Sequence, residues 1–223
     1  LVDYVDFSPR QVVGTSASLI PFLQHDEANR ALMGTHMQCQ AVPLVRPGSP
    51  YMMTGMEGIV ASAMGRVVWA VNPGTVTYVD SERVEIKING TPKGRVDGDR
   101  VKRVGGKEIY TLEKFMRTSQ STCFNQRPVV SVGDKVRAGD IIIDGPGADQ
   151  GNLSLGQNLL VAYCSFEGLG FEDAIAISDR VVREDLLTSI HIEDYTAQIV
   201  DTKLGPEELT RDIPNVAEGD LSN

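Results

Sequence analysis

The chain has 223 residues and a net charge of −9, and 41% of its residues are hydrophobic. This length allows one large domain or two smaller ones, and the ordinary apolar content excludes a disordered chain. No apolar run approaches the ~18 residues that a membrane-spanning helix requires, which excludes such a helix.

The charge and the cysteines narrow the class of protein further. Residues 1–75 carry a net charge of −1, residues 76–138 carry +5 and residues 139–223 carry −13. The basic centre could contact phosphate, with solvated hairpin faces as the local alternative, but the whole chain is not an electrostatic clamp for nucleic acid. The three cysteines are far apart and form no CxxC, which favours reduced thiols in a cytosol over a zinc site.

The first predicted element is a short helix of one or two turns over residues 28–33. Asp26 is its candidate N-cap, and Gly34 is its expected end. Three prolines in residues 40–51 then predict extended coil.

Residues 58–109 have a β pattern, in which β-branched runs are separated by turn signals at Asn72-Pro73-Gly74 and Asn89-Gly90. Residues 96–112 continue this pattern as charged hairpins. Trp69 and Tyr78 fit core positions or cross-strand pairs better than a ligand site.

Residues 127–146 have the most regular rhythm, with turns at Gly133-Asp134 and Gly139-Asp140 and a buried strand at residues 141–143. This rhythm is typical of small barrels and barrel-sandwich hybrids. Residues 158–166 predict another strand, and Ser178 is the expected N-cap of a following helix. A last short helix is expected to begin at Pro206.

The adjacent carboxylates of Glu172 and Asp173 are the first candidate site. On a continuous strand the two side chains would point to opposite faces, but at a strand end that enters a turn both can face one opening. Magnesium takes one or two protein carboxylates together with water and substrate phosphates. The pair therefore fits one wall of a metal–phosphate site, while an exposed acidic turn that caps the next helix is the simpler alternative.

Arg30 is the second candidate, because its planar guanidinium suits phosphate oxygens. A salt bridge to Asp26 or Glu27 is the local alternative. The three histidines share no ligand spacing, and the chain has no serine-nucleophile elbow and no complete phosphate-binding glycine loop.

Four stretches of the chain resemble one known family. They are residues 16–45, residues 122–158, residues 170–182 ("GFEDAIAISDRVV") and residues 201–216 ("DTKLGPEELTRDIPNV"). Together they resemble the β subunit of bacterial DNA-directed RNA polymerase, in the family's order and from about Val2 to Val216. In that family the region is internal to a longer subunit, which agrees with the absence of an initiator Met and the abrupt end.

The resemblance implies a role in nucleotidyl transfer for DNA-templated RNA synthesis. The family's Asn-Arg-Ala-Leu-Met-Gly motif matches residues 29–34, so Asn29 and Arg30 are expected at the triphosphate of the incoming nucleotide. The family's Phe-Glu-Asp motif places Glu172 and Asp173 near the second Mg²⁺, partly through water, and the β′ subunit supplies the principal metal ligands. The isolated chain is expected to be inactive.

The expected partners are the β′ and α subunits, a sigma factor, template DNA, the RNA transcript and nucleoside triphosphates, without a membrane. The expected location is the cytoplasm, in association with the nucleoid. The chain departs from the family at Leu169-Gly170, where Tyr-Asn is common, and at His36 and Cys39. These changes leave nucleotide placement as expected but make inhibitor sensitivity doubtful.

The expected fold class is mainly β with short helices (α+β), with part of a double-psi β-barrel and barrel-sandwich-like β segments. We expect an active-site-proximal segment at residues 1–50, a hairpin-rich segment at 51–128, half of the barrel with the acid pair at 129–190 and the start of a flap region at 191–223. A non-catalytic barrel-sandwich binding or scaffold module is the alternative. A metal-dependent hydrolase is disfavoured, because nucleophile and ligands are too few.

Overall fold

The computed structural model describes residues 3–94, residue 98 and residues 100–222. The chain divides into two compact units, Leu1–Ile192 and Glu193–Asn223. The α-helices are α1 (Thr15–Ser18), α2 (Ala28–Cys39), α3 (Glu57–Ala63) and α4 (Asp179–Arg183), and the 3₁₀ helices are η1 (Pro9–Val12), η2 (Leu23–His25) and η3 (Glu218–Leu221). The strands are β1 (Val68–Trp69), β2 (Gly74–Val79), β3 (Arg83–Ile88), β4 (Val101–Val104), β5 (Lys107–Thr111), β6 (Met116–Arg117), β7 (Cys123–Phe124), β8 (Arg127–Pro128), β9 (Lys135–Val136), β10 (Ile141–Asp144), β11 (Ala148–Asp149), β12 (Asn152–Leu153), β13 (Asp201–Thr202) and β14 (Gly205–Pro206).

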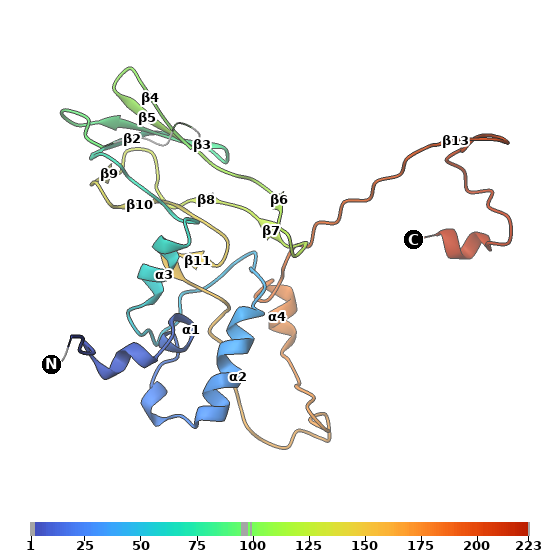
Figure 1. Ribbon diagram of the computed structural model, residues 1–223, viewed down its shortest axis with the longest axis horizontal. Helices are drawn as coiled ribbons and strands as arrows, with labels where there is room; N and C mark the ends of the chain where they lie inside the picture. Colours follow the sequence, from blue (N-terminus) through green and yellow to red (C-terminus); the bar gives the residue numbers. More distant parts are fainter. Residues whose placement is uncertain (1–2, 95–97, 99, 223) are drawn as a thin grey trace. The chain divides into compact units, whose positions relative to one another are not determined.

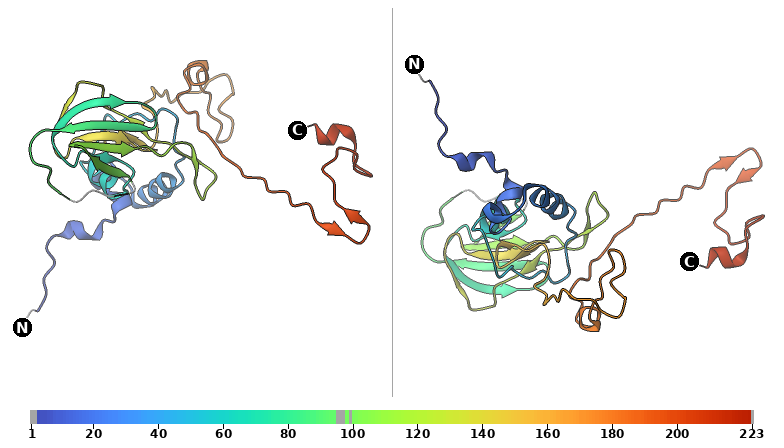
Figure 2. Two further views of the ribbon diagram at one scale, coloured as in Figure 1. Left: turned by 90° about the horizontal axis from the view of Figure 1, so that it is seen from above. Right: turned by 90° about the horizontal axis from the view of Figure 1, so that it is seen from below.

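A five-stranded antiparallel sheet in the order β4-β5-β3-β2-β9 is the largest element of the first unit (Figure 1). Water is excluded from one face at the centre of this sheet, because Val84 and Ile86 of β3 and Tyr110 of β5 are fully buried. Register pairs Val84 with Tyr110, so alternate residues of both strands face the same core. The two further views in Figure 2 show these strands as one twisted layer with the N-terminal helices to one side of it.

A second sheet, in the order β1-β10-β8, shares this core. Ile142 and Ile143 of β10 are fully buried in the cluster that also contains Val76 and Ile86. Trp69 of β1 packs against a smaller cluster around Ala61 of α3. The expected class, mainly β with short helices, is confirmed.

The two Gly-Asp turns before β9 and β10 are formed as the sequence predicts. Gly133 and Gly139 have φ of +99° and +90°, a region that glycine enters without a Cβ penalty. The carboxylate of Asp134 accepts the N–H of Ser131 at 2.7 Å, and Asp140 accepts that of Arg137 at 2.7 Å. Each aspartate therefore closes its own turn.

The aromatic predictions are also confirmed. Tyr78 of β2 lies under the guanidinium of Arg83 on the neighbouring strand, 4.9 Å from the ring centroid, and donates its hydroxyl hydrogen bond to Asp80 at 2.9 Å. This is a cross-strand pair, as the strand pattern indicates.

Helix α2 is longer than predicted. It continues through Gly34 to Cys39, and Glu27, rather than Asp26, is its N-cap. A glycine inside a helix costs only about 1 kcal/mol, which contacts of α2 with α1 can offset. The prediction that Gly34 ends the helix is therefore wrong.

Residues 57–63 form helix α3, although the sequence predicts β structure from residue 58. The carboxylate of Glu57 accepts hydrogen bonds from the N–H groups of Thr54 and Gly55, both at 2.9 Å, which fixes the start of the helix. Ala61 then packs into the second cluster. Capping and tertiary packing decide this segment against its β pattern.

Two further predictions in the C-terminal third are wrong. Residues 158–166 form no strand, because no other described segment pairs with them, and Leu160 and Tyr163 are almost fully exposed. Pro206 lies in the second unit, in the hairpin of β13 and β14, instead of starting a helix. The helix after Ser178 is confirmed, since the Ser178 hydroxyl accepts the N–H of Arg180 at 3.3 Å.

The charged hairpin predicted over residues 96–112 is present as β4 and β5, but residues 95–97 and 99 lie outside the described part of the chain. The double-psi β-barrel and the fourfold division of the chain remain predictions.

Candidate functional site

Asn29 and Arg30 occupy the exposed first turn of α2. The Glu27 side chain caps this turn by accepting the Asn29 amide at 2.7 Å and the Arg30 N–H at 3.1 Å. The guanidinium of Arg30 approaches the sulfur of Met33 at 3.6 Å, and in the described part of the chain it forms no ion pair with Asp26 or Glu27. Its cationic group is therefore exposed and available to an anion from outside the chain.

Glu172 and Asp173 are the two central residues of a turn, in which the N–H of Ala174 donates to the carbonyl of Phe171 at 3.3 Å. Glu172 has a φ of +57°, a left-handed conformation that is uncommon for a residue with a side chain. Both carboxylates are exposed. Because the backbone is a turn and not a strand, the two side chains are not forced to opposite faces.

The structure does not join the two halves of the expected site. Among the described residues, no hydrogen bond or ion pair connects Asn29 or Arg30 with Glu172 or Asp173. No cluster of three or more His, Cys, Asp or Glu side chains that could hold a metal ion is found in the described ranges. The two exposed carboxylates nevertheless fit Mg²⁺ as a partial site, since this ion commonly takes one or two protein carboxylates and fills its other positions with water and phosphate.

The acidic segment, residues 156–178, is anchored by a group of amide contacts that the sequence does not predict. Asn158 donates its side-chain N–H to the carbonyl of Ser49 at 2.7 Å and accepts the N–H of Tyr51 at 3.3 Å. Gly48 donates its N–H to the carbonyl of Gly156 at 2.9 Å. These bonds tie the coil that follows α2 to the start of the segment that carries Glu172 and Asp173.

Glu57 is a second polar residue that the sequence-based predictions missed. It is only 4% exposed, and its signal was present as the Thr-x-x-Glu capping pattern of residues 54–57. Burial raises the pKa of its carboxyl, but hydrogen bonds from Thr54 and Gly55 outweigh burial and leave the pKa below its ordinary value. Glu57 is therefore ionised at neutral pH.

Side chains of β4 and β5 form a polar network around a buried carboxylate. Glu108, with no exposed surface, accepts hydrogen bonds from Asn72 at 2.7 Å, Arg103 at 2.8 Å and Tyr110 at 2.8 Å. Burial raises the pKa of Glu108, yet these three donors lower it below its ordinary value. Burial, with the nearby Glu108 carboxylate, raises the pKa of Tyr110. Every oxygen of the carboxylate is occupied, so we assign this network to stability.

Comparison of the sequence with known proteins shows the family to which the chain belongs. The chain belongs to the family described as RNA polymerase Rpb2, domain 6, whose model matches residues 69–223. It is similar to a protein named DNA-directed RNA polymerase subunit beta from Caulobacter sp. (strain K31), with 54% identity over 222 residues, which are 100% of this chain and 16% of the relative. The protein of the same name from Koribacter versatilis (strain Ellin345) is 50% identical over 220 residues, 99% of this chain and 14% of the relative.

The chain thus spans only a small part of the length of these curated relatives. The resemblance that the sequence motifs indicate is confirmed. In the part of the chain that the structure describes, no helix is long and apolar enough to cross a membrane.

Proposed function

We propose that this chain is an internal part of the β subunit of a DNA-directed RNA polymerase and contributes to its nucleotidyl-transfer centre. The observation that carries the proposal is the 54% identity with a named β subunit over the whole chain. It is supported by the exposure of Asn29, Arg30, Glu172 and Asp173, which contrasts with the closely packed sheets of the same chain. Groups that serve a site completed by other chains have to be accessible in this way.

In this proposal, Arg30 binds the triphosphate of the incoming nucleotide, and its guanidinium offsets phosphate charge. Asn29 keeps its amide on the Glu27 cap, so it orients the first turn of α2 and presents Arg30. Arginine suits this task because it stays charged and presents its donors in a planar fork.

Glu172 and Asp173 would hold a nucleotide-associated Mg²⁺, partly through water, together with ligands from the β′ subunit. When bound, that ion neutralises charge on the β- and γ-phosphates and on the leaving pyrophosphate. Without it, the two carboxylates would repel a triphosphate, so their contribution depends on the metal. The other partners proposed are the α subunits, a sigma factor, template DNA and the transcript, in a cytoplasmic enzyme.

The test is Arg30→Ala in the assembled polymerase, measured as the nucleotide dependence of single-nucleotide addition. A lost charged hydrogen bond costs about 1–3 kcal/mol, so the apparent KM for the nucleotide should rise roughly 5- to 150-fold. Arg30→Lys should recover part of this loss because it keeps the charge but not the fork.

The matched control is Arg180→Ala, since Arg180 is also an exposed helical residue but pairs with Glu184 at 2.9 Å. This variant should leave the KM unchanged. An unchanged nucleotide dependence in Arg30→Ala would refute the assignment of Arg30 to the triphosphate.

A further inference from the structure

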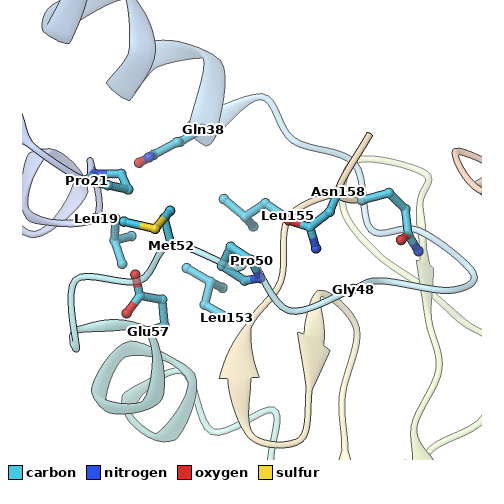
Figure 3. A pocket seen from close by; sticks show the side chains of 12 residues that line it. Leu19, Pro21, Gln38, Gly48, Pro50, Met52, Glu57, Leu153, Leu155 and Asn158 are labelled. Carbon is cyan, nitrogen blue, oxygen red and sulfur yellow. The ribbon is translucent and has the colours of Figure 1, made fainter. Parts of the chain in front are cut away.

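A pocket of about 260 Å³ lies between α2, α3 and the segment that follows β12 (Figure 3). Much of its wall is apolar, from Leu19, Pro21, Pro50, Met52, Leu153 and Leu155. None of Asn29, Arg30, Glu172 and Asp173 lines it, so a ligand role for this pocket is independent of the proposed nucleotide role.

Glu57 contributes a negative charge to one end of this pocket. Its Oε1 atom accepts the N–H and the hydroxyl of Thr54, at 2.9 and 3.2 Å, and its Oε2 atom accepts the N–H of Gly55 at 2.9 Å. The N–H of Glu57 itself also interacts with this carboxylate, so its donors all come from residues 54–57. No cationic side chain of the described residues pairs with Glu57, although charges this deeply buried are normally paired.

Gln38 of α2 supplies a second acceptor to the pocket wall. Its Oε1 atom is buried and has no hydrogen-bond partner among the described residues. Figure 3 shows Gln38 and Glu57 at opposite sides of the pocket, with Pro21, Leu19 and Met52 between them. A buried acceptor without a partner is destabilising, and a ligand that donates a hydrogen bond removes this penalty.

The other two polar side chains of the wall take part in hydrogen bonds within the chain. Gln157 donates its amide N–H to the carbonyl of Arg46, and Asn158 is bonded to Ser49 and Tyr51. The carboxylate of Glu57 and the buried amide oxygen of Gln38 therefore face a largely apolar space. The negative charge of Glu57 disfavours anionic ligands.

We propose that this pocket binds an ammonium group carried on an apolar stem, with the ammonium at Glu57 and a second hydrogen-bond donor at Gln38. A dry cavity of roughly 150 Å³ takes up a benzene molecule, so this pocket has room for a chain of about five carbons with a polar group at each end. The ammonium can come from a free alkyl diamine or from a lysine side chain outside this chain.

The first arm of the test uses the assembled polymerase and a photoreactive, diazirine-bearing pentylamine, with the labelled peptides mapped by mass spectrometry. Label is expected on peptides that contain Leu19–Pro21 or Leu153–Leu155. 1,5-Diaminopentane should displace it at concentrations about tenfold or more below those of 1,5-pentanediol, because a hydrogen bond to a charged group is stronger than a neutral one. Equal displacement by the diamine and the diol would overturn the free-amine source.

Two variants assign the recognition to its residues. Glu57→Gln keeps an acceptor but removes the charge, so the preference for diamine over diol should disappear. Gln38→Met removes the acceptor without a large change in shape, so 1,5-diaminopentane should compete no better than 1-aminopentane, which lacks the second donor. Glu184→Gln, at the exposed C-cap of α4, should change neither preference.

Gln38→Met should not lower stability, since it replaces an unsatisfied buried polar group with an apolar one. A changed ligand preference in this variant would therefore not result from a folding defect. If both variants retain the diamine preference of the parent, the assignment to Glu57 and Gln38 is wrong.

The second arm distinguishes the source of the ammonium. Zero-length carbodiimide crosslinking of the assembled polymerase, without added amine, should join Glu57 to a lysine if the protein itself fills the pocket. In that case the pentylamine probe gives no label here, and the ammonium site stands with a protein source. Absence of both the crosslink and a diamine-sensitive label would overturn the proposal.

Discussion

The five-stranded sheet and the acidic segment of residues 156–178 contain similar side chains in opposite surroundings. Glu108 in strand β5 has no exposed surface and has three hydrogen-bond donors from this chain. Glu172 is exposed in a turn, and no hydrogen bond to its carboxylate is found among the described residues. A carboxylate whose hydrogen-bond donors all belong to this chain stabilises the fold. An exposed carboxylate without such donors is available to a ligand or to another chain.

The comparison predicts a ranked set of effects on the free energy of unfolding, which the fluorescence of the chain's one tryptophan, Trp69, can report during urea titration. The largest effect is expected for Glu108→Ala. It leaves Arg103, Asn72 and Tyr110 without their common partner, and breaking a buried charged pair in this way costs about 3–5 kcal/mol.

The control for this variant is Glu113→Ala. Glu113 pairs with Arg100 at 3.5 Å, and the two side chains are 34% and 44% exposed, so the cost should be within about 1 kcal/mol. Equal losses in the two variants would remove the distinction between buried and exposed carboxylates.

The next effect is expected for Gly74→Ala at the start of β2. A Cβ at this position would lie 2.4 Å from the carbonyl oxygen of Lys87 on the paired strand. Relief of this overlap requires a backbone shift, and overpacking of this kind costs about 1–3 kcal/mol. Gly98→Ala, where a Cβ would meet nothing within 4 Å, should change stability much less in the same titration.

The pH dependence of the free energy of unfolding tests the contribution of the buried carboxylates separately. Because the pKa values of Glu57 and Glu108 are lower in the folded state than their ordinary value of 4.5, the unfolded chain takes up protons first as the pH falls. The stability from these groups is fully present above pH 4.5 and is lost as the pH falls through the folded pKa values, with a limit of about 1.4 kcal/mol per pH unit for each proton.

The measurement is the urea midpoint as a function of pH for the parent chain and for a variant with Glu57→Gln and Glu108→Gln. The variant should show a flatter decline below pH 4.5. An identical slope in both proteins would mean that neither carboxyl has a lowered pKa.

The smallest effect on stability is expected for the double change Glu172→Gln and Asp173→Asn. Both residues are exposed and lie away from the sheets, so the free energy of unfolding should change by no more than about 0.5 kcal/mol. In the assembled polymerase, however, the Mg²⁺ concentration needed for half-maximal nucleotide addition should rise. Glu167→Gln, another exposed acid of this segment with a left-handed backbone, should change neither quantity.

Much of the sheet could be predicted from the sequence because its signals are local. Gly133-Asp134 and Gly139-Asp140 close their turns with their own backbone and side chains, and the alternation in β3 places Val84 and Ile86 on one face. Helix α3 and the length of α2 were missed because packing on Ala61 and against α1 overrides weak local preferences.

For the candidate site, the residue types could be predicted and their arrangement could not. The motifs around Arg30 and Glu172 identify the family, and the family comparison confirms it. The amide contacts of Asn158 with Ser49 and Tyr51, more than a hundred residues away in the chain, have no local signature. The same is true of the pocket that brings Gln38 to Glu57.

The sequence by itself determined the family, the β-rich class and the turns of the sheet, since these depend on residue identity, alternation and backbone permissiveness over a few positions. Only the tertiary structure decided which carboxylates find partners far away in the chain. Glu108 and Glu172 are the same residue type, but Glu108 is buried and accepts a hydrogen bond from Asn72, while Glu172 remains exposed in its turn. Partnership between residues far apart in the chain is a property of packing, and no short stretch of sequence specifies that packing.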